Sequence, residues 1–209
     1  MPEFSLLLGF VSAALVVLIL PGPGVLYVIA RSVSQGQRAG FASVLGLSVG
    51  AMVHVIAAAV GLSALLLASA PAFTVVKWLG AGYLIYLGVR TWLERDSEID
   101  VGLPEPRSYR RLFGDGVVVS VLNPKIAMFF VAFLPQFVQP ARGPVAVQIL
   151  LLGGIYVALA LVTDGVYAVL AGRLGHWLAG RHRPGRWVRA AGGSVYVGLG
   201  VTTALSDRP

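Results

Sequence analysis

The sequence predicts an all-α polytopic membrane protein of six transmembrane helices, and three observations support this fold class. First, 57% of the 209 residues are hydrophobic and only 12% are charged, whereas a typical soluble domain is ~25% charged. Second, six segments are apolar over ~20 residues or more, the length that crosses a bilayer. Third, proline and glycine interrupt two of these segments. A soluble fold of this length has too little interior to bury so much apolar surface.

The expected spans form two groups of three. They occupy residues 4–29, 41–69 and 73–93, then residues 115–138, 146–171 and 188–206. Only one charge, Glu3, precedes the first apolar run, which continues through its break, so we expect a retained span rather than a signal peptide. Residues 94–114 are rich in charges and proline and are expected to form a solvated cytoplasmic linker. This linker divides the chain into a first repeat, residues 1–93, and a second repeat, residues 115–209.

Basic residues are concentrated in alternate connections between the spans. Counted with their helix ends, connections one, three and five contain Arg31, Arg38, Arg90, Arg95, Arg107, Arg110, Arg111, Arg173, Arg181, Arg183, Arg186 and Arg189. The opposite side has only Lys77, Arg142 and Arg208, and Lys125 lies within the fourth span. By the positive-inside rule, the arginine-rich connections face the cytoplasm and both termini face outward.

The two groups of spans resemble each other, which predicts an inverted 3+3 repeat. Residues 80–89 of the third span are similar to residues 192–201 of the sixth, and the break at Pro23 matches the break at Pro124. Because each group has an odd number of crossings, the two groups must lie in opposite orientations in the membrane. Many secondary transporters are built from such inverted repeats.

The breaks in the first and fourth spans are the main functional signal. Proline removes a backbone donor, and at bilayer depth the freed polar groups must face protein or a wet cavity. After the first break, the amides of Gly24, Val25 and Leu26 begin a new helical stretch, where they can hold a carboxylate. The predicted substrate site comprises Pro21, Gly22, Pro23, Gly24, Val25, Asn123, Pro124 and Lys125. The alternative is a packing kink without a ligand.

Two charged residues within the spans are the best candidates for binding and coupling. Lys125 places a positive charge near membrane depth at a cost of roughly 2.5–3.5 kcal/mol, so it needs a partner, either a substrate carboxylate or Asp164. Alternatively, Lys125 lies near the cytoplasmic face and snorkels. Asp164 is the only acidic residue deep within a span and is the first candidate for proton coupling. Its alternatives are binding the substrate ammonium or a structural pair with Lys125 or a tyrosine.

His54, near the middle of the second span, is the second candidate for proton coupling, because histidine titrates near neutral pH. An alignment of the two repeats that the flanking similarities permit places it opposite Asp164. The alternative is a neutral histidine bonded across helices. In the same span, Gly46 and Gly50 form a G-x-x-x-G pattern, which is typical either of a homodimer face or of close packing within one subunit.

Three motifs in order resemble the LysE/RhtB family of amino-acid exporters. They are residues 21–24, residues 77–88, and residues 123–125 followed by Phe129, Phe130 and residues 133–137, which begin with Phe133. The resemblance covers nearly the whole chain, including its six-span length. It implies a protein of the bacterial inner membrane that exports amino acids or close derivatives, by exchange with protons.

The sequence also disfavours other classes of function. It contains no cysteine and only three histidines, so disulfides, a thiol nucleophile and a metal centre are not expected, and we expect no cofactor. It has no H-E-x-x-H motif and no paired aspartates within a span, so an intramembrane enzyme is disfavoured. The net charge of +7 is explained by topology rather than by nucleic acid. A passive channel or a structural scaffold remains the alternative to a transporter.

The expected substrate is a small neutral amino acid. The first three spans have no carboxylate at membrane depth, so a cationic substrate side chain would find only Asp164. The substrate ammonium needs the same group. Threonine, homoserine and leucine are the types of cargo that the family resemblance implies, and the sequence does not choose among them.

Overall fold

The computed structural model describes residues 3–68 and 105–178, together with positions 75, 78, 82, 85, 86 and 89. Within these residues the chain is helical and contains no strand. The expected third span, apart from those six positions, and the whole of the sixth lie outside the described residues. So do residues 94–104 of the expected linker.

Two long helices and two broken ones form the described bundle. The long helices are α3 (Gln37–Ala68) and α7 (Val145–Leu178), and both are long and apolar enough to cross a membrane. The broken ones are α1 (Phe4–Ile19) with α2 (Pro23–Gln35), bent by 52°, and α5 (Tyr109–Val121) with α6 (Pro124–Met128) and its continuation, bent by 47°. Counting each bent pair as one span, the described residues contain up to four spans. The expected interruptions of the first and fourth spans are therefore present.

Between α6 and α7 the helix first widens into a π-helix and then tightens into two 3₁₀ turns. A π-helix, η1 (Phe129–Phe133), leads into the 3₁₀ turns η2 (Leu134–Phe137) and η3 (Pro140–Arg142). Single π-turns inside α-helices are rare and are found mostly near functional sites. The π-helix η1 places a phenylalanine ring of this segment against aromatic rings of α1 and α7.

Local chemistry explains where the helices begin. Pro23 and Pro124 occupy the first turns of α2 and α6, where a missing N–H costs no helical hydrogen bond. Gly36 has φ 81°, in the left-handed region that favours glycine, and it ends α2 so that α3 follows at once. Ser108 accepts a hydrogen bond from the Arg111 amide and starts α5 at Tyr109, before the expected span start at residue 115.

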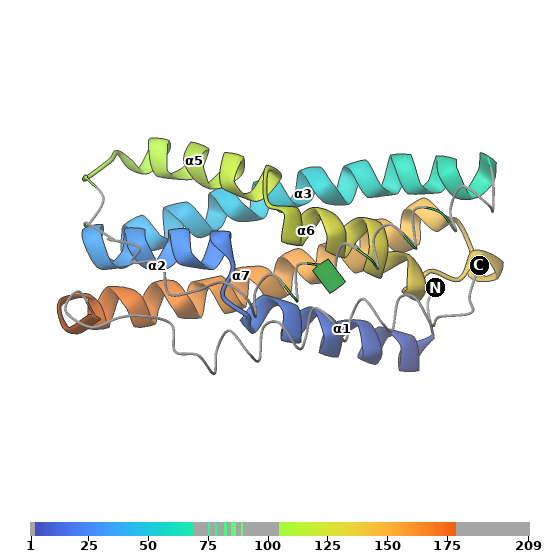
Figure 1. Cartoon of the computed structure of the whole chain (residues 1–209), viewed down its shortest axis with the longest axis horizontal. Coiled ribbons are helices and arrows are strands. Elements are labelled where there is room, and N and C mark those ends of the chain that lie inside the picture. Colours follow the sequence, from blue (N-terminus) through green and yellow to red (C-terminus); the bar gives the residue numbers. More distant parts are fainter. Residues whose placement is uncertain are drawn as a thin grey trace.

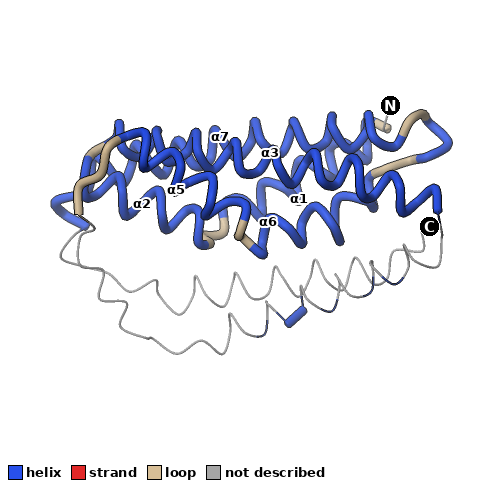
Figure 2. The backbone as a smooth tube through the Cα atoms, turned by 90° about the horizontal axis from the view of Figure 1, so that it is seen from above, coloured by secondary structure: helices blue, strands red, loops and turns tan. Residues whose placement is uncertain are grey.

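The breaks lie in the middle of the bundle. The long helices α3 and α7 run along its whole length, with α2 and α5 at one end and α1 and α6 at the other (Figure 1). Seen from above, the two breaks are short loop segments close together at mid-length (Figure 2), and a hydrogen bond between Lys125 Nζ and the Leu20 carbonyl joins them. This arrangement brings segments from the two halves of the sequence to one point.

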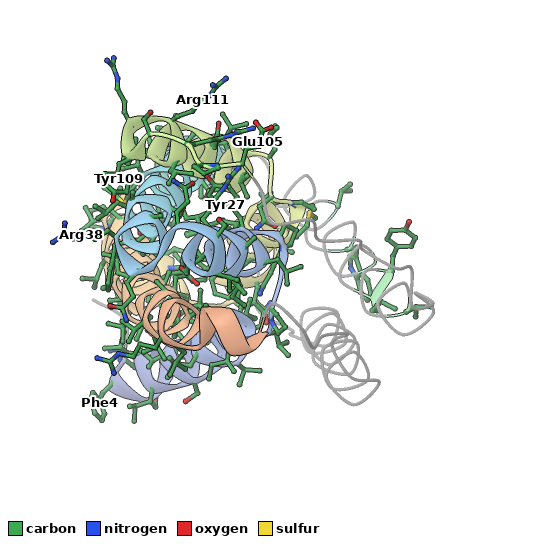
Figure 3. The ribbon with its side chains drawn as sticks, turned by 90° about the vertical axis from the view of Figure 1, so that its left-hand side faces the viewer. Phe4, Tyr27, Arg38, Glu105, Tyr109 and Arg111 are labelled. Carbon is green, nitrogen blue, oxygen red and sulfur yellow. The ribbon has the colours of Figure 1, made fainter. Side chains whose placement is uncertain are left out.

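The two ends of the bundle differ in charge. At the end formed by α2 and α5, which Figure 3 faces, the helix ends expose Arg38, Arg107, Arg110, Arg111 and Arg173, and Arg107 forms an ion pair with Asp115. At the other end, Arg142 forms an ion pair with Glu3. This is the distribution expected if the α2 and α5 end is cytoplasmic. The orientation of the chain remains a prediction.

Glycines let α3 and α5 approach closely. A methyl group on Gly46 would lie 2.1 Å from the Phe113 carbonyl oxygen, and one on Gly50 would lie 2.5 Å from Ser120 Cβ. Neither position has room for a side chain. The G-x-x-x-G pattern is thus used for packing within one subunit, the second of the two alternatives, and a homodimer remains a prediction without this support.

Candidate functional site

A small cavity of about 40 Å³ lies where the two breaks meet. The first broken helix lines it with Leu18, Gly22, Gly24 and Val25, the second with Asn123, Lys125 and Ile126, α3 with Leu47, Ser48 and Ala51, and α7 with Tyr156, Ala160 and Asp164. The volume suffices for about three water molecules. A large aromatic cluster from α1, η1 and α7 lies on one side, and a smaller cluster around Val28, Val44, Leu47 and Ala168 on the other.

Most of the predicted site residues line this cavity. They are Gly22, Gly24, Val25, Asn123, Lys125 and Asp164. Pro21, Pro23 and Pro124 do not line it, but they shape the breaks that do. Ser48 and Tyr156 were missed because nothing in their local sequence separates them from other residues of apolar helices.

Lys125 links the two breaks. Its side chain is buried, with 8% exposure of the residue, and its Nζ donates a hydrogen bond of 2.7 Å to the Leu20 carbonyl oxygen. In a continuous helix that carbonyl would accept from the Gly24 amide. Because Lys125 points inward to the other break, its position differs from the snorkelling alternative.

Asp164 faces the cavity without a direct partner. The residue is 8% exposed, and among the described residues its carboxylate makes no hydrogen bond or ion pair. It interacts electrostatically with Lys125, which lines the same cavity. A buried carboxylate without direct partners is costly unless a proton or a cation accompanies it. Beside Lys125, this carboxylate still has oxygens that can accept a proton or a hydrogen bond from a second cation.

Two main-chain amides at the start of α2 complete the polar lining. Within the described residues, the amides of Gly24 and Val25 make no hydrogen bond, because the break removes their helical acceptors. The expectation for Leu26 is wrong: its amide donates to the Gly22 carbonyl at 2.9 Å, since the new helix already supplies an acceptor. Free amides at a helix N-terminus favour an anion.

His54 does not line the cavity. Its Nε2 lies 3.1 Å from the Ser120 carbonyl oxygen of α5, and its ring stacks on Phe130 with 6.4 Å between centroids. This geometry matches the alternative of a histidine bonded across helices. A proton-coupling role for His54 remains a prediction.

Tyr167 makes the corresponding contact at the first break, and the sequence analysis missed it. Its hydroxyl donates a hydrogen bond of 2.6 Å to the Ile19 carbonyl oxygen. One signal was available: Tyr167 follows Asp164 by three residues, so both side chains lie on one face of α7.

Ten of the lining residues form pairs at two constant sequence offsets. The first offset pairs Gly22 with Asn123, Gly24 with Lys125 and Val25 with Ile126, and a second, larger offset pairs Leu47 with Ala160 and Ala51 with Asp164. His54 and Tyr167 are separated by the same second offset. Both side chains contact a main-chain carbonyl at a break, and this offset differs from the expected alignment, which places His54 opposite Asp164. Both charged residues belong to the second half of the chain.

Comparison with known proteins gives a consistent result. The sequence model of the family described as LysE type translocator matches residues 15–207. A homoserine/homoserine lactone efflux protein of Salmonella typhimurium is 35% identical over 185 residues, which is 88% of each chain. An uncharacterized membrane protein of Vibrio cholerae is 32% identical over 199 residues, 95% of this chain and 96% of the relative. No solved structure matches.

Proposed function

The chain belongs to the LysE type translocator family, and from this premise we propose that it exports a small neutral amino acid or derivative in exchange for protons. The family and the membrane-protein relatives make it a bacterial membrane protein of amino-acid export. Beyond this, the proposal assigns the protein to the inner membrane and specifies the substrate class and the coupling ion. The observation that carries it is the cavity between two helix breaks, lined by one cation, one acid and free amides.

The cavity offers complementary groups for a zwitterion. Lys125 Nζ and the amides of Gly24 and Val25 supply positive charge and donors for a carboxylate. Asp164 supplies the matching acceptor for an α-ammonium. No third charged side chain among the described residues lines the cavity, so a charged substrate side chain would remain unpaired.

The apolar part of the cavity supports a small substrate side chain. Leu47, Ala51 and Ala160 offer apolar contacts, and Ser48 offers a hydroxyl. The name of the Salmonella relative, which refers to homoserine and its lactone, agrees with a short, uncharged side chain.

We assign proton coupling to Asp164. A proton and the substrate ammonium can each neutralise this carboxylate, and they compete for the same oxygens. Competition at one acid suffices to couple exit of the substrate to entry of a proton. No equivalent acid exists in the first half, because Ala51 occupies the corresponding position.

The six-helix inverted repeat is part of the proposal. Support comes from the constant offsets of the lining residues and from the two breaks meeting at mid-length of the bundle. Inverted repeats place a substrate site at the repeat interface near the membrane midplane. With the arginine-rich end cytoplasmic, both termini face outward.

Transport by Lys125→Met and Asp164→Asn proteins tests the proposal. Purified protein is reconstituted in liposomes loaded with homoserine, and efflux is measured together with internal acidification. We expect Lys125→Met to reduce exchange about 10- to 100-fold, the effect of losing a charge-assisted hydrogen bond. Asp164→Asn should abolish the response to a pH gradient. Arg111→Met, at the exposed start of α5, and Asp115→Asn, whose half-buried carboxylate pairs with Arg107 away from the cavity, serve as matched controls.

Each alternative gives a different result in this experiment. A passive channel would release homoserine down its gradient without acidifying the interior, and a scaffold would release nothing. Normal exchange by both Lys125→Met and Asp164→Asn would overturn the site assignment. It would leave the transporter assignment standing.

A further inference from the structure

Two side chains outside the cavity form hydrogen bonds with main-chain carbonyl oxygens at the helix breaks. They are Tyr167 of α7 and His54 of α3. We propose that both are positioning residues, which hold the breaks in the shape that the transport site requires. The role in transport rests on the proposed function, whereas the capping itself does not.

The position of each contact follows from helix geometry. In an α-helix, the carbonyl of residue i accepts from the amide of residue i+4, and proline has no amide hydrogen. Pro23 therefore leaves the Ile19 carbonyl without its helical donor, and Pro124 does the same for Ser120. These are the two carbonyls that Tyr167 Oη and His54 Nε2 reach, at 2.6 Å and 3.1 Å.

The chemistry of the contacts fixes the direction of both hydrogen bonds. A carbonyl oxygen can only accept, so the Tyr167 hydroxyl and the His54 Nε2–H are the donors. The contact therefore requires a form of His54 with its proton on Nε2. The Tyr167–Ile19 contact is exposed and the His54–Ser120 contact is part-buried. A carbonyl that faces lipid has no water as a donor, so there a side-chain donor is the available substitute.

The capping is crossed between the two halves of the chain. Tyr167 belongs to the second half and caps the first break, whereas His54 belongs to the first half and caps the second break. Each cap follows a cavity-lining residue of its helix, Asp164 or Ala51, by three positions. A shift of α7 or α3 therefore moves both a wall of the cavity and the carbonyl that shapes the opposite break.

The two caps differ in whether the capped carbonyl has a second hydrogen-bond donor. Among the described residues, Tyr167 is the only donor to the Ile19 carbonyl. The Ser120 carbonyl also accepts from the Asn123 amide at 3.1 Å, so it keeps one partner without His54. Loss of the tyrosine hydroxyl should consequently have the larger effect.

A stability cycle tests the capping without relying on transport. Tyr167→Phe removes only the hydroxyl, and we expect it to lower the thermal unfolding midpoint of the purified protein by about 3 °C. In a Pro23→Ala background, the new amide can serve the Ile19 carbonyl, so Tyr167→Phe should cost at most half as much. Tyr109→Phe, at an exposed tyrosine near the start of α5, is the matched control and should have no effect. Equal losses in both backgrounds, or no loss at all, would overturn the proposal.

Exchange in liposomes tests the positioning role. We expect Tyr167→Phe to slow homoserine exchange about tenfold and His54→Phe to slow it less. His54→Gln keeps a side-chain N–H donor, so it should restore exchange with the wild-type pH profile. A shifted pH profile in His54→Gln would show that the histidine carries protons and would overturn its positioning role. Wild-type exchange by both phenylalanine variants would overturn positioning for both residues.

The two tests separate the failure of this inference from the failure of the proposed function. If the wild-type protein moves no amino acid but the stability cycle shows coupling, the caps stand and the exporter assignment falls. If exchange is normal in every variant and the cycle shows no coupling, the caps fall and the exporter assignment stands.

Discussion

The two helix breaks solve the same backbone problem in different ways. The first is longer, from Leu20 to Gly22, and Gly22 provides no side-chain cap for α2. Its free carbonyls are taken by Tyr167 and Lys125, both from the other half of the chain. The second break caps itself, because Asn123 Oδ1 accepts from the Lys125 amide at 3.0 Å.

This difference gives the two halves separate tasks at one cavity. The self-capped break uses its amides internally and contributes a side-chain charge through Lys125. The first break keeps the amides of Gly24 and Val25 free and contributes main-chain polarity. At this cavity the first break contributes backbone groups, and the second half of the chain contributes both charged side chains. A zwitterion needs both kinds of group, which is why neither half alone would form the proposed site.

The largest expected effect comes from disturbing the support of the second break. A methyl group at Gly50 would lie 2.5 Å from Ser120 Cβ and 2.6 Å from the Val117 carbonyl oxygen. Gly50→Ala should therefore push α3 from α5, weaken the His54 contact and lower the free energy of unfolding by about 2 kcal/mol. Chemical unfolding of the purified protein measures this. Gly154→Ala, on α7 with no described atom within 4 Å of the new methyl, is the control and should cost nothing. Equal stability of the two variants would mean that the close approach is not needed.

A smaller effect is expected from giving the first break the kind of side-chain cap that the second break has. Gly22 corresponds to Asn123, and its extended backbone, φ −124° and ψ −173°, accepts any residue. In Gly22→Asn, the new amide oxygen should accept from the Gly24 amide, which the substrate carboxylate would otherwise use. We expect the KM for homoserine exchange to rise about tenfold. Gly22→Ala adds bulk without an acceptor and controls for the 3.2 Å approach of Lys125 Cδ. If both variants raise KM equally, bulk rather than capping is responsible.

The smallest effect is expected from removing the cap of the second break. Asn123→Ala deletes the acceptor for the Lys125 amide, so the free energy of unfolding should fall by about 1 kcal/mol. Denaturant unfolding of purified protein, compared with Gly22→Ala, measures the difference. Because Gly22 has no cap to lose, its substitution should cost less. The reverse order would contradict the distinction between a self-capped break and an externally held one.

The sequence predicted several features correctly because they depend on local chemistry. The apolar runs and the missing proline amides indicated helices interrupted in the first and fourth spans, and both interruptions are present. The motifs around the breaks identified the family, which the family match confirms. The presence of Lys125 and Asp164 in one cavity agrees with the predicted partnership, while their roles remain proposals.

Other features were missed or misplaced because they depend on the exact start of a helix or on distant segments. The Leu26 amide was expected to be free, but the exact residue at which α2 begins gives it an acceptor. The expected alignment of the repeats placed His54 opposite Asp164, whereas the contacts at the two breaks align it with Tyr167. Helix periodicity tells which residues share a face, but it does not tell how far one helix slides along another.

The sequence by itself indicated where the backbone lacks donors, since a proline inside an expected helix removes the hydrogen bond to the carbonyl four residues earlier. It also indicated that one lysine and one aspartate lie within apolar spans, where water is scarce. Only the tertiary structure decided which groups answer those needs: Tyr167 and Lys125 at the first break, His54 and Asn123 at the second. The reason is physical. An unpaired polar group can be located from covalent structure alone, but its partner is selected by helix packing across the whole chain.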